Sequence, residues 1–421
     1  MALFKNEAAM QSWMEKQLKC VDGFSELLIS SDVPPPTTTE EESITKSYEF
    51  CLKALNQNIV ISANENISLD PSDILKPDFI LYSTESEAVV IIELKNLAGP
   101  SRQAGTELGA YTAEIKQYLP LIAGSDVLSI VVSTHWPALL KHYIFNEIVW
   151  GNKCVLCLRP IEQNKEIMLE LVPPNEMIEG SLAVSLSEEH LGGFHVSLYD
   201  MNLYSGGARN RIDIYIEQMK TAAKYVAAKG REQGNNGFAF LWKNERKDTL
   251  APYFITIVNI APFKMLERFA HTIDILNNSI LDRIIKNVII EYSPDGHGAS
   301  IGAQSEDAIQ FLSTFCSAQA EGFLSWPDLK AFMMESSNLI SFEAWGIFEK
   351  TLFSELEKEY AGGNITLRSN DPNLGLKALS KVIDSNYNYT DLRYFYTDSL
   401  EDEDEDEDCF LRCNDSTDEK F

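Results

Sequence analysis

The sequence has no uninterrupted apolar stretch near the roughly 20 residues that a membrane-spanning helix requires. Its first residues, Met-Ala-Leu-Phe-Lys-Asn-Glu, lack the apolar core of a secretion signal. The seven cysteines are odd in number and widely scattered, which argues against a disulfide framework and for a reducing compartment. We therefore expect a cytoplasmic protein that has no membrane partner.

Several signatures of known chemistry are also missing. The chain has no Walker-type phosphate loop and no glycine-rich dinucleotide fingerprint, and its six histidines show no paired ligand spacing. Cys154 and Cys157 have the spacing of a zinc or redox pair, but they lie in a strand-like run. Residues three apart in a strand face opposite sides of the sheet, so two buried thiols are the favoured interpretation.

Positive charge is scarce, because 35 Lys and Arg residues stand against 63 Asp and Glu residues and the net charge is −28. Residues 398–421 contribute twelve acids and two bases, including the unbroken acidic run Glu401–Asp408. Such a run cannot bury apolar surface, so we predict a disordered acidic tail. The tail either aids solubility or occupies a basic groove as a brake. Nucleic-acid binding needs cations, which a metal ion or a local basic segment would have to supply.

The most informative stretch runs from Pro77-Asp78 to Glu93-Leu94-Lys95. Two apolar runs flank the polar turn Ser83–Glu87, which is typical of a β-hairpin. Side chains alternate along a strand, so Glu93 and Lys95 point the same way, and Asp78 can fall beside them from the partner strand. Two converging carboxylates repel unless a cation lies between them, and oxygen ligands suit Mg²⁺ or Mn²⁺.

This hairpin resembles the core of the PD-(D/E)XK superfamily, the restriction-endonuclease-like nucleases. The resemblance covers roughly residues 40–175. It implies that Asp78 and Glu93 hold the metal, and that Lys95 activates the attacking water and offsets charge in the transition state. The alternative is a strand-end ion pair between Glu93 and Lys95, with Asp78 as a turn-forming residue after proline.

The elements around the hairpin also match that family. A helical pattern at 44–55 carries Glu49, which the resemblance makes a supporting metal ligand and catalytic residue. Gln103, Glu107 and Tyr111 share one face of the helix that follows the hairpin, and they would position substrate. The family's usual Gln-x-x-x-Tyr pattern is altered, since Glu107 takes the Gln position. A strand at 58–62 before the hairpin and a strand at 126–134 after it complete an αβββαβ core, which a helix at 136–150 and a strand at 154–158 extend.

We therefore predict an α/β protein with four parts. These are an N-terminal helix and linker (1–39), the nuclease-like domain (40–175), an α+β, mostly helical C-terminal domain (176–397) and the acidic tail (398–421). In the third part we expect a connector followed by strands at 194–199, 238–242 and 253–258. The pattern becomes helical after Phe263, with helices expected at 266–277, 279–292, 306–320, 326–336 and 342–360, the fourth capped by Ser325.

One segment runs against the acidic trend, because residues 205–250 hold nine Lys and Arg residues and five Asp and Glu residues. It combines an amphipathic helix with a Gly/Asn-rich loop at 229–237. The helix alone is equally explained as a solvated surface whose acids come early and bases late, as the helix dipole prefers. The candidate nucleic-acid-binding residues are Arg209, Arg211, Lys220, Lys224, Lys229 and Arg231.

Together these patterns predict a Mg²⁺- or Mn²⁺-dependent endonuclease, with DNA as the expected substrate. By family analogy alone, a bacterial anti-phage defence effector is the expected role. One alternative is a catalytically silent nuclease fold that acts as an adaptor. Another is a nuclease gated by a ligand or partner bound to the C-terminal half. Besides nucleic acid, the candidate partners are a regulatory protein and a second copy of the chain in a homo-oligomer.

Overall fold

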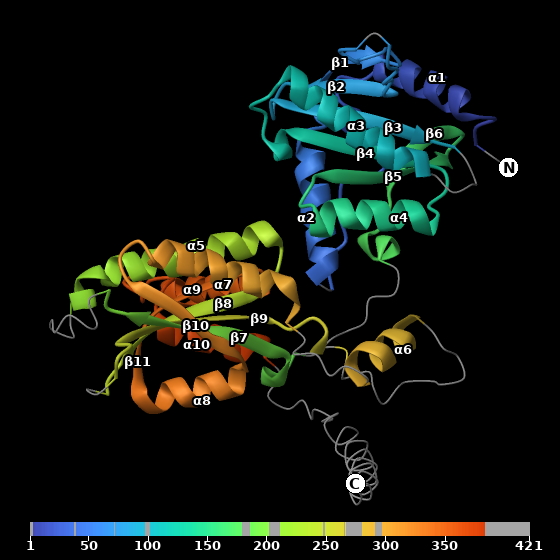
Figure 1. Ribbon diagram of the computed structural model, residues 1–421. Coiled ribbons are helices and arrows are strands. Elements are labelled where there is room, and N and C mark those ends of the chain that lie inside the picture. Colours follow the sequence, from blue (N-terminus) through green and yellow to red (C-terminus); the bar gives the residue numbers. More distant parts are fainter. Residues whose placement is uncertain are drawn as a thin grey trace, which may run out of the picture. The chain divides into compact units, whose positions relative to one another are not determined.

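The computed structural model describes residues 3–37, 39–70, 72–96, 102–178, 186–201, 211–246, 249–264, 266, 280–290 and 297–383. The chain divides into two compact units, residues 1–183 and 184–421, which are coloured along the sequence in Figure 1. The division comes after the boundary expected at residue 175, because Met177 and Ile178 still pack in the core of the first unit. The predicted acidic tail, 398–421, lies outside the described residues.

The first unit is built on a six-stranded mixed sheet with the order β1-β2-β3-β4-β5-β6. Helix α2 packs against β5, while α1 and α3 pack against β3. A π-helical turn at Asn146–Trp150 follows α4. The elements are α1 (Glu7–Leu18), α2 (Thr39–Lys53), β1 (Asn58–Ala63), β2 (Phe79–Ser83), β3 (Ala88–Lys95), α3 (Arg102–Tyr118), β4 (Val127–Ser133), α4 (Ala138–Phe145), β5 (Val155–Gln163) and β6 (Glu166–Leu171).

The predicted hairpin is confirmed: β2 and β3 are antiparallel and pair from Phe79–Ile92 to Ser83–Ala88. β3 then pairs in parallel with β4, and β4 with β5. This places β3 inside the sheet, which explains why its residues are apolar at nearly every position. The end of β3 that carries Glu93 and Lys95 therefore lies beside the start of β2.

The second unit contains a five-stranded antiparallel sheet with the order β10-β7-β9-β8-β11. Helices α5 and α7 pack on one face, and α8, α9 and α10 on the other (Figure 1). The elements are β7 (Leu191–Tyr199), α5 (Ile216–Gln233), β8 (Gly237–Asn244), β9 (Tyr253–Ile260), α6 (Ile280–Ile284), α7 (Gly298–Leu312), β10 (Ser317–Ser325), α8 (Trp326–Ser336), β11 (Ser337–Trp345), α9 (Ile347–Ala361) and α10 (Pro372–Val382).

The prediction of a mostly helical region after Phe263 is wrong at two places. The helix expected at 306–320 ends at Leu312, and the edge strand β10 begins at Ser317. The helix expected at 342–360 begins only at Ile347, since Phe342–Trp345 belong to β11. In both cases pairing with a distant strand overrides local helix propensity. The helix at 326–336 is confirmed, and the Ser325 side chain accepts the cap bond from the Asp328 N–H.

The described cysteines, Cys20, Cys51, Cys154, Cys157 and Cys316, are all free thiols. Cys157 is fully buried, and burial raises its pKa to about 12. Among the helices of the described segments, none is both long and apolar enough to cross a membrane. The helix predicted at 266–277 falls on residues that, except for Leu266, lie outside the described part of the chain.

Candidate active site at the end of strand β3

Asp78 and Glu93 come together where β2 begins and β3 ends. Phe79 pairs with Ile92 in the antiparallel ladder, so Asp78 lies opposite Glu93. The Asp78 carboxylate accepts a hydrogen bond from the Leu94 backbone N–H at 2.7 Å, which fixes it beside the end of β3. The backbone carbonyl of Asp78 accepts from the Asn64 N–H at 3.0 Å. The sequence prediction that these two carboxylates converge is therefore consistent with the geometry.

Lys95 is surrounded by acidic side chains. Its Nζ lies 2.5 Å from Oε1 of Glu93 and 3.0 Å from Oε2 of Glu107 on α3. A third carboxylate, Glu7 in the first turn of α1, lies 4.0 Å from the same nitrogen. Glu93 is 3% exposed and Lys95 8% exposed, so this is a buried ion pair with two further acids at its edge.

Burial and repulsion from neighbouring carboxylates raise the pKa values of the carboxyl groups of Asp78 and Glu93. The pKa of Glu93 is raised to about 9, first by burial and then by the charge of Asp78, although Lys95 lowers it. The pKa of Asp78 is raised to about 6 by burial, against the lowering effect of the Leu94 N–H bond. Burial lowers the pKa of Lys95, but Glu93 and Glu107 outweigh burial and the net shift is upward. The site therefore favours additional positive charge.

One carboxylate oxygen of Glu93 is not used in a hydrogen bond to the described residues. Its Oε2 is buried and has no hydrogen-bond partner among the described residues. A buried acceptor left in this way is costly unless another group satisfies it. Together with Asp78 it offers oxygen ligands of the kind that Mg²⁺ and Mn²⁺ prefer. The residues present thus fit a divalent ion.

The protein does not supply a complete metal cage. Within the described segments, no group of three or more His, Cys, Asp and Glu side chains is arranged to hold a metal ion. Mg²⁺ is often bound by only one or two carboxylates, with waters and substrate phosphates as the other ligands. A site built on Asp78 and Glu93 would be of this second kind.

Tyr111 is buried and holds the chain segment that leads into Asp78. Its side chain is 4% exposed and its hydroxyl donates to the Lys76 carbonyl at 3.0 Å. Farther along α3, Glu114 accepts from the Leu69 N–H and the Tyr118 hydroxyl donates to the Ile67 carbonyl. These hydrogen bonds from one face of α3 hold the backbone of the loop before β2 in place. Tyr111 therefore positions Asp78 indirectly, through the backbone of Lys76.

The other two positions predicted on α3 differ. Glu107 reaches the site through its ion pair with Lys95. Gln103 lies in the first turn of α3, but its side chain is outside the described part of the structure. Its predicted contact with substrate stays a prediction.

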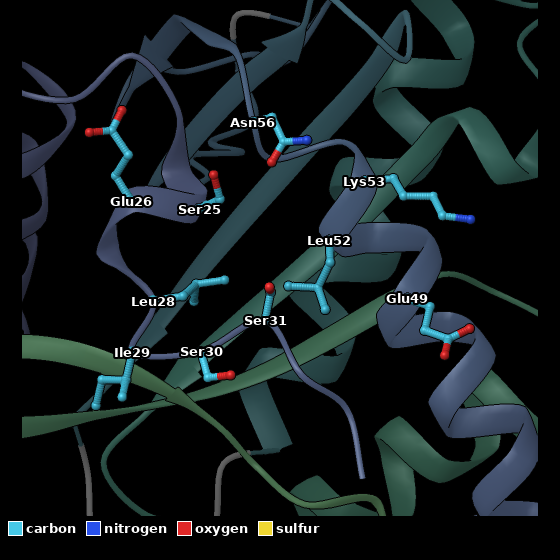
Figure 2. A pocket seen from close by; sticks show the side chains of 10 residues that line it. All are labelled: Ser25, Glu26, Leu28, Ile29, Ser30, Ser31, Glu49, Leu52, Lys53 and Asn56. Atoms are coloured by element: carbon cyan, nitrogen blue, oxygen red, sulfur yellow. The ribbon is translucent and has the colours of Figure 1, made fainter. Parts of the chain in front are cut away.

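Glu49 lies elsewhere in the first unit. Ile44 and Tyr48 form the buried stripe of α2, and the adjacent Glu49 is exposed. Glu49 lines a separate cavity of about 610 Å³ together with Ser25 and Lys53, as Figure 2 shows. The charges that shift the pKa of Asp78 belong to Lys95, Glu7 and Glu107, and those that shift the pKa of Glu93 belong to Asp78 and Lys95. Glu49 is not among them.

Helix α1, which was expected to belong to a separate N-terminal part, also brings a carboxylate to the site. Glu7 follows the N-cap Asn6, whose side chain accepts from the Ala9 N–H. Acids are favoured in the first turn of any helix, so Glu7 carried no signal of its own in the sequence. Only the packing of α1 against β3 shows its proximity to Lys95.

The predicted basic surface is largely neutralised within the protein. Lys220 pairs with Glu217 at 2.7 Å and Lys229 with Glu232 at 3.0 Å. Arg231 makes a two-pronged contact with Glu349 on α9, with hydrogen bonds of 2.8 and 3.0 Å. Lys224 is exposed. Arg209 lies outside the described residues, as does the side chain of Arg211.

The Gly/Asn-rich loop predicted at 229–237 is also wrong in its first half. Helix α5 continues to Gln233, and Gly234 ends it with φ +68°. The Trp345 ring packs against Gly230, and a Cβ atom at this position would lie only 2.5 Å from that ring. This close packing explains why a glycine occupies the middle of the helix. Lys229 and Arg231 are therefore held on a helix surface rather than in a loop that could wrap a nucleic acid.

Comparison with protein-family models, with curated proteins and with solved structures finds no match to this chain. The interpretation of the site depends on the geometry and electrostatics of Asp78, Glu93 and Lys95.

Proposed function

We propose that the first unit is a metal-dependent phosphodiesterase that hydrolyses nucleic acid, with DNA as the expected substrate. The observation that carries the proposal is the convergence of Asp78, Glu93 and Lys95 at the end of β3, where one buried oxygen of Glu93 has no hydrogen-bond partner in the described part of the chain. Asp78 and Glu93 would hold Mg²⁺ or Mn²⁺. When bound, the ion supplies Lewis-acid polarisation of a phosphoryl oxygen and lowers the pKa of a water molecule.

Lys95 would provide the positive charge that the reaction needs. Its ammonium group lies 2.5 Å from Glu93 and is buried, so bulk water screens its charge little. Such a group can orient an attacking water and offset the negative charge that develops on the phosphate. Tyr111 and Glu107 on α3 would keep Asp78 and Lys95 in place.

The topology supports the same proposal. The order α2, β1, β2, β3, α3, β4 reproduces the αβββαβ arrangement expected from the sequence, with β3 parallel to β4. The resemblance to restriction-like nucleases, the anti-phage role and the cytoplasmic location remain predictions. The binding of DNA through the 205–250 segment is a weaker part of the hypothesis, because Lys220, Lys229 and Arg231 are engaged in ion pairs.

The decisive experiment is a cleavage assay with the full chain. Supercoiled plasmid, single-stranded DNA and RNA are incubated with Mg²⁺, with Mn²⁺ and with a chelator. We expect metal-dependent cleavage of at least one substrate, and a loss of about 100-fold or more in Glu93→Gln and in Lys95→Ala. Glu49→Gln is the matched control, since Glu49 is an exposed acid that lines a different cavity.

The same assay separates the adaptor hypothesis from the enzyme. Equal behaviour of the wild type, Glu93→Gln and Lys95→Ala with every substrate and metal would favour a catalytically silent fold in which Lys95 only neutralises buried acids. A loss in Glu49→Gln equal to that in Glu93→Gln would contradict the assignment of the site to the end of β3.

A further inference from the structure

A cavity of about 560 Å³ lies within the second unit, away from any residue used above. Strand β7 contributes His195, Ser197 and Tyr199, which share one face because they are two residues apart. Phe254 of β9 and Phe332 of α8 form apolar parts of the cavity wall, and Arg246, from the segment after β8, also lines the cavity. The volume falls within the range of sites that bind small molecules.

His195 is the unusual residue of this cavity. It is 4% exposed, yet neither ring nitrogen has a hydrogen-bond partner among the described residues. Its ring lies 4.5 Å from that of Phe254 and 5.9 Å, edge-on, from that of Phe332. Burial lowers its pKa to about 4, so the imidazole is neutral at pH 7 and holds one N–H donor and one acceptor nitrogen. Buried polar groups in folded proteins are generally paired. His195 belongs to the cavity wall, but both of its nitrogens are shielded from solvent, so a bound ligand would pair with one of them after a rotation of the ring.

The charged groups of the cavity are not equivalent. Glu321 of β10 accepts a hydrogen bond from the Tyr199 hydroxyl at 2.7 Å, which occupies one of its two oxygens, so an anionic group of a ligand would have to lie on the Arg246 side of the cavity. Arg246 is exposed, and within the described residues its guanidinium makes no ion pair or hydrogen bond. The cavity therefore offers an available cation next to an aromatic wall.

We propose that this cavity binds a small ligand that combines a planar aromatic ring with an anionic group. The ring would lie against Phe254 and Phe332, with a heteroatom or hydroxyl paired to His195. The anion would pair with Arg246. Nucleoside monophosphates and aromatic carboxylates both have this chemistry. The proposal is independent of the nuclease assignment, because every residue in it belongs to the second unit.

Isothermal titration calorimetry on the full chain tests the proposal. Separate titrations use the four common nucleoside monophosphates, the corresponding nucleosides, indole-3-carboxylate and benzoate, and inorganic phosphate. We expect saturable binding of a monophosphate or an aromatic carboxylate, with weaker binding of the partner compound that lacks the ring or the anion. The absence of saturable binding by every ringed anion at about 1 mM would overturn the proposal, and so would equal affinity for inorganic phosphate alone.

Two substitutions locate the binding. His195→Phe keeps an aromatic ring but removes both nitrogens, and Arg246→Gln removes the cation from an exposed position where folding is not at risk. Each should weaken binding about tenfold or more, while Arg368→Gln, an exposed arginine that does not line the cavity, should leave it unchanged. Unchanged affinity in Arg246→Gln, or an equal loss in Arg368→Gln, would place the ligand elsewhere and overturn the proposal.

Discussion

Replacing Lys95 by alanine distinguishes a metal site from a purely structural ion pair. The substitution removes the ammonium group that lies 2.5 Å from Glu93 and 3.0 Å from Glu107. Removing one partner of a buried pair generally costs about 3–5 kcal/mol. Once the ammonium group is gone, Glu93 can take up a proton, because burial and the charge of Asp78 both raise the pKa of this carboxyl, and this limits the loss. We therefore expect the first unit to lose about 3 kcal/mol of unfolding free energy at neutral pH.

The response to Mg²⁺ is the informative part of this experiment. If Asp78 and Glu93 form a metal site, the ion replaces the missing ammonium charge and restores most of the lost stability. An ion present at 100 times its dissociation constant stabilises the folded state by about 2.7 kcal/mol. Hydrogen exchange followed by mass spectrometry on β3 peptides measures this change in the first unit alone, with and without Mg²⁺.

Lys153→Ala provides the matched control. Lys153 pairs with Glu147 on the surface of the same unit, and its side chain is 47% exposed. Its replacement should cost about 0–1 kcal/mol and show no added response to Mg²⁺. If Mg²⁺ fails to protect β3 in Lys95→Ala, the carboxylates do not bind the ion and the proposed hydrolytic role is wrong.

Three further predictions follow from particular contacts. The pKa values of Asp78 and Glu93 are raised to about 6 and about 9, so the folded chain keeps these protons at pH values where the unfolded chain has lost them. Their contribution to stability therefore falls as pH rises from about 4, the ordinary carboxyl pKa, to about 6 for Asp78 and about 9 for Glu93. Because Mg²⁺ binds the deprotonated forms, its effect on melting temperature should be larger at about pH 8 than at about pH 5.5, and equal effects would contradict the site. Tyr111→Phe removes one hydrogen bond and should cost about 1 kcal/mol by urea denaturation, with a lower cleavage rate; an unchanged rate would show that α3 does not position Asp78. Gly230→Ala should destabilise the second unit by about 1–3 kcal/mol in thermal melts because a ring packs against it. Gly109→Ala, where no atom lies within 4 Å, should be neutral or stabilising by up to about 1 kcal/mol.

Local patterns were sufficient for the elements around the candidate site. The apolar runs on either side of the 83–87 turn predict the hairpin, and strand alternation places Glu93 and Lys95 on one side. Pro77-Asp78 at the start of the partner strand then brings Asp78 opposite Glu93. These inferences succeed because a hairpin is formed by residues close in the sequence, whose pairing is set by the turn and by the alternation of side chains.

Tertiary packing decided the rest. No local signal shows that Glu7 of α1 approaches Lys95 or that Glu49 lines a pocket elsewhere in the first unit. Nor does any local signal show that the two ring nitrogens of His195 lack partners among the residues that the structure describes. The same holds for β10 and β11, whose residues pair with strands more than 90 positions earlier in the chain. The composition and spacing of the residues indicate which face of each helix or strand is apolar. Which distant strands and helices meet is decided by the combined burial of those faces, and that is a property of the folded chain as a whole.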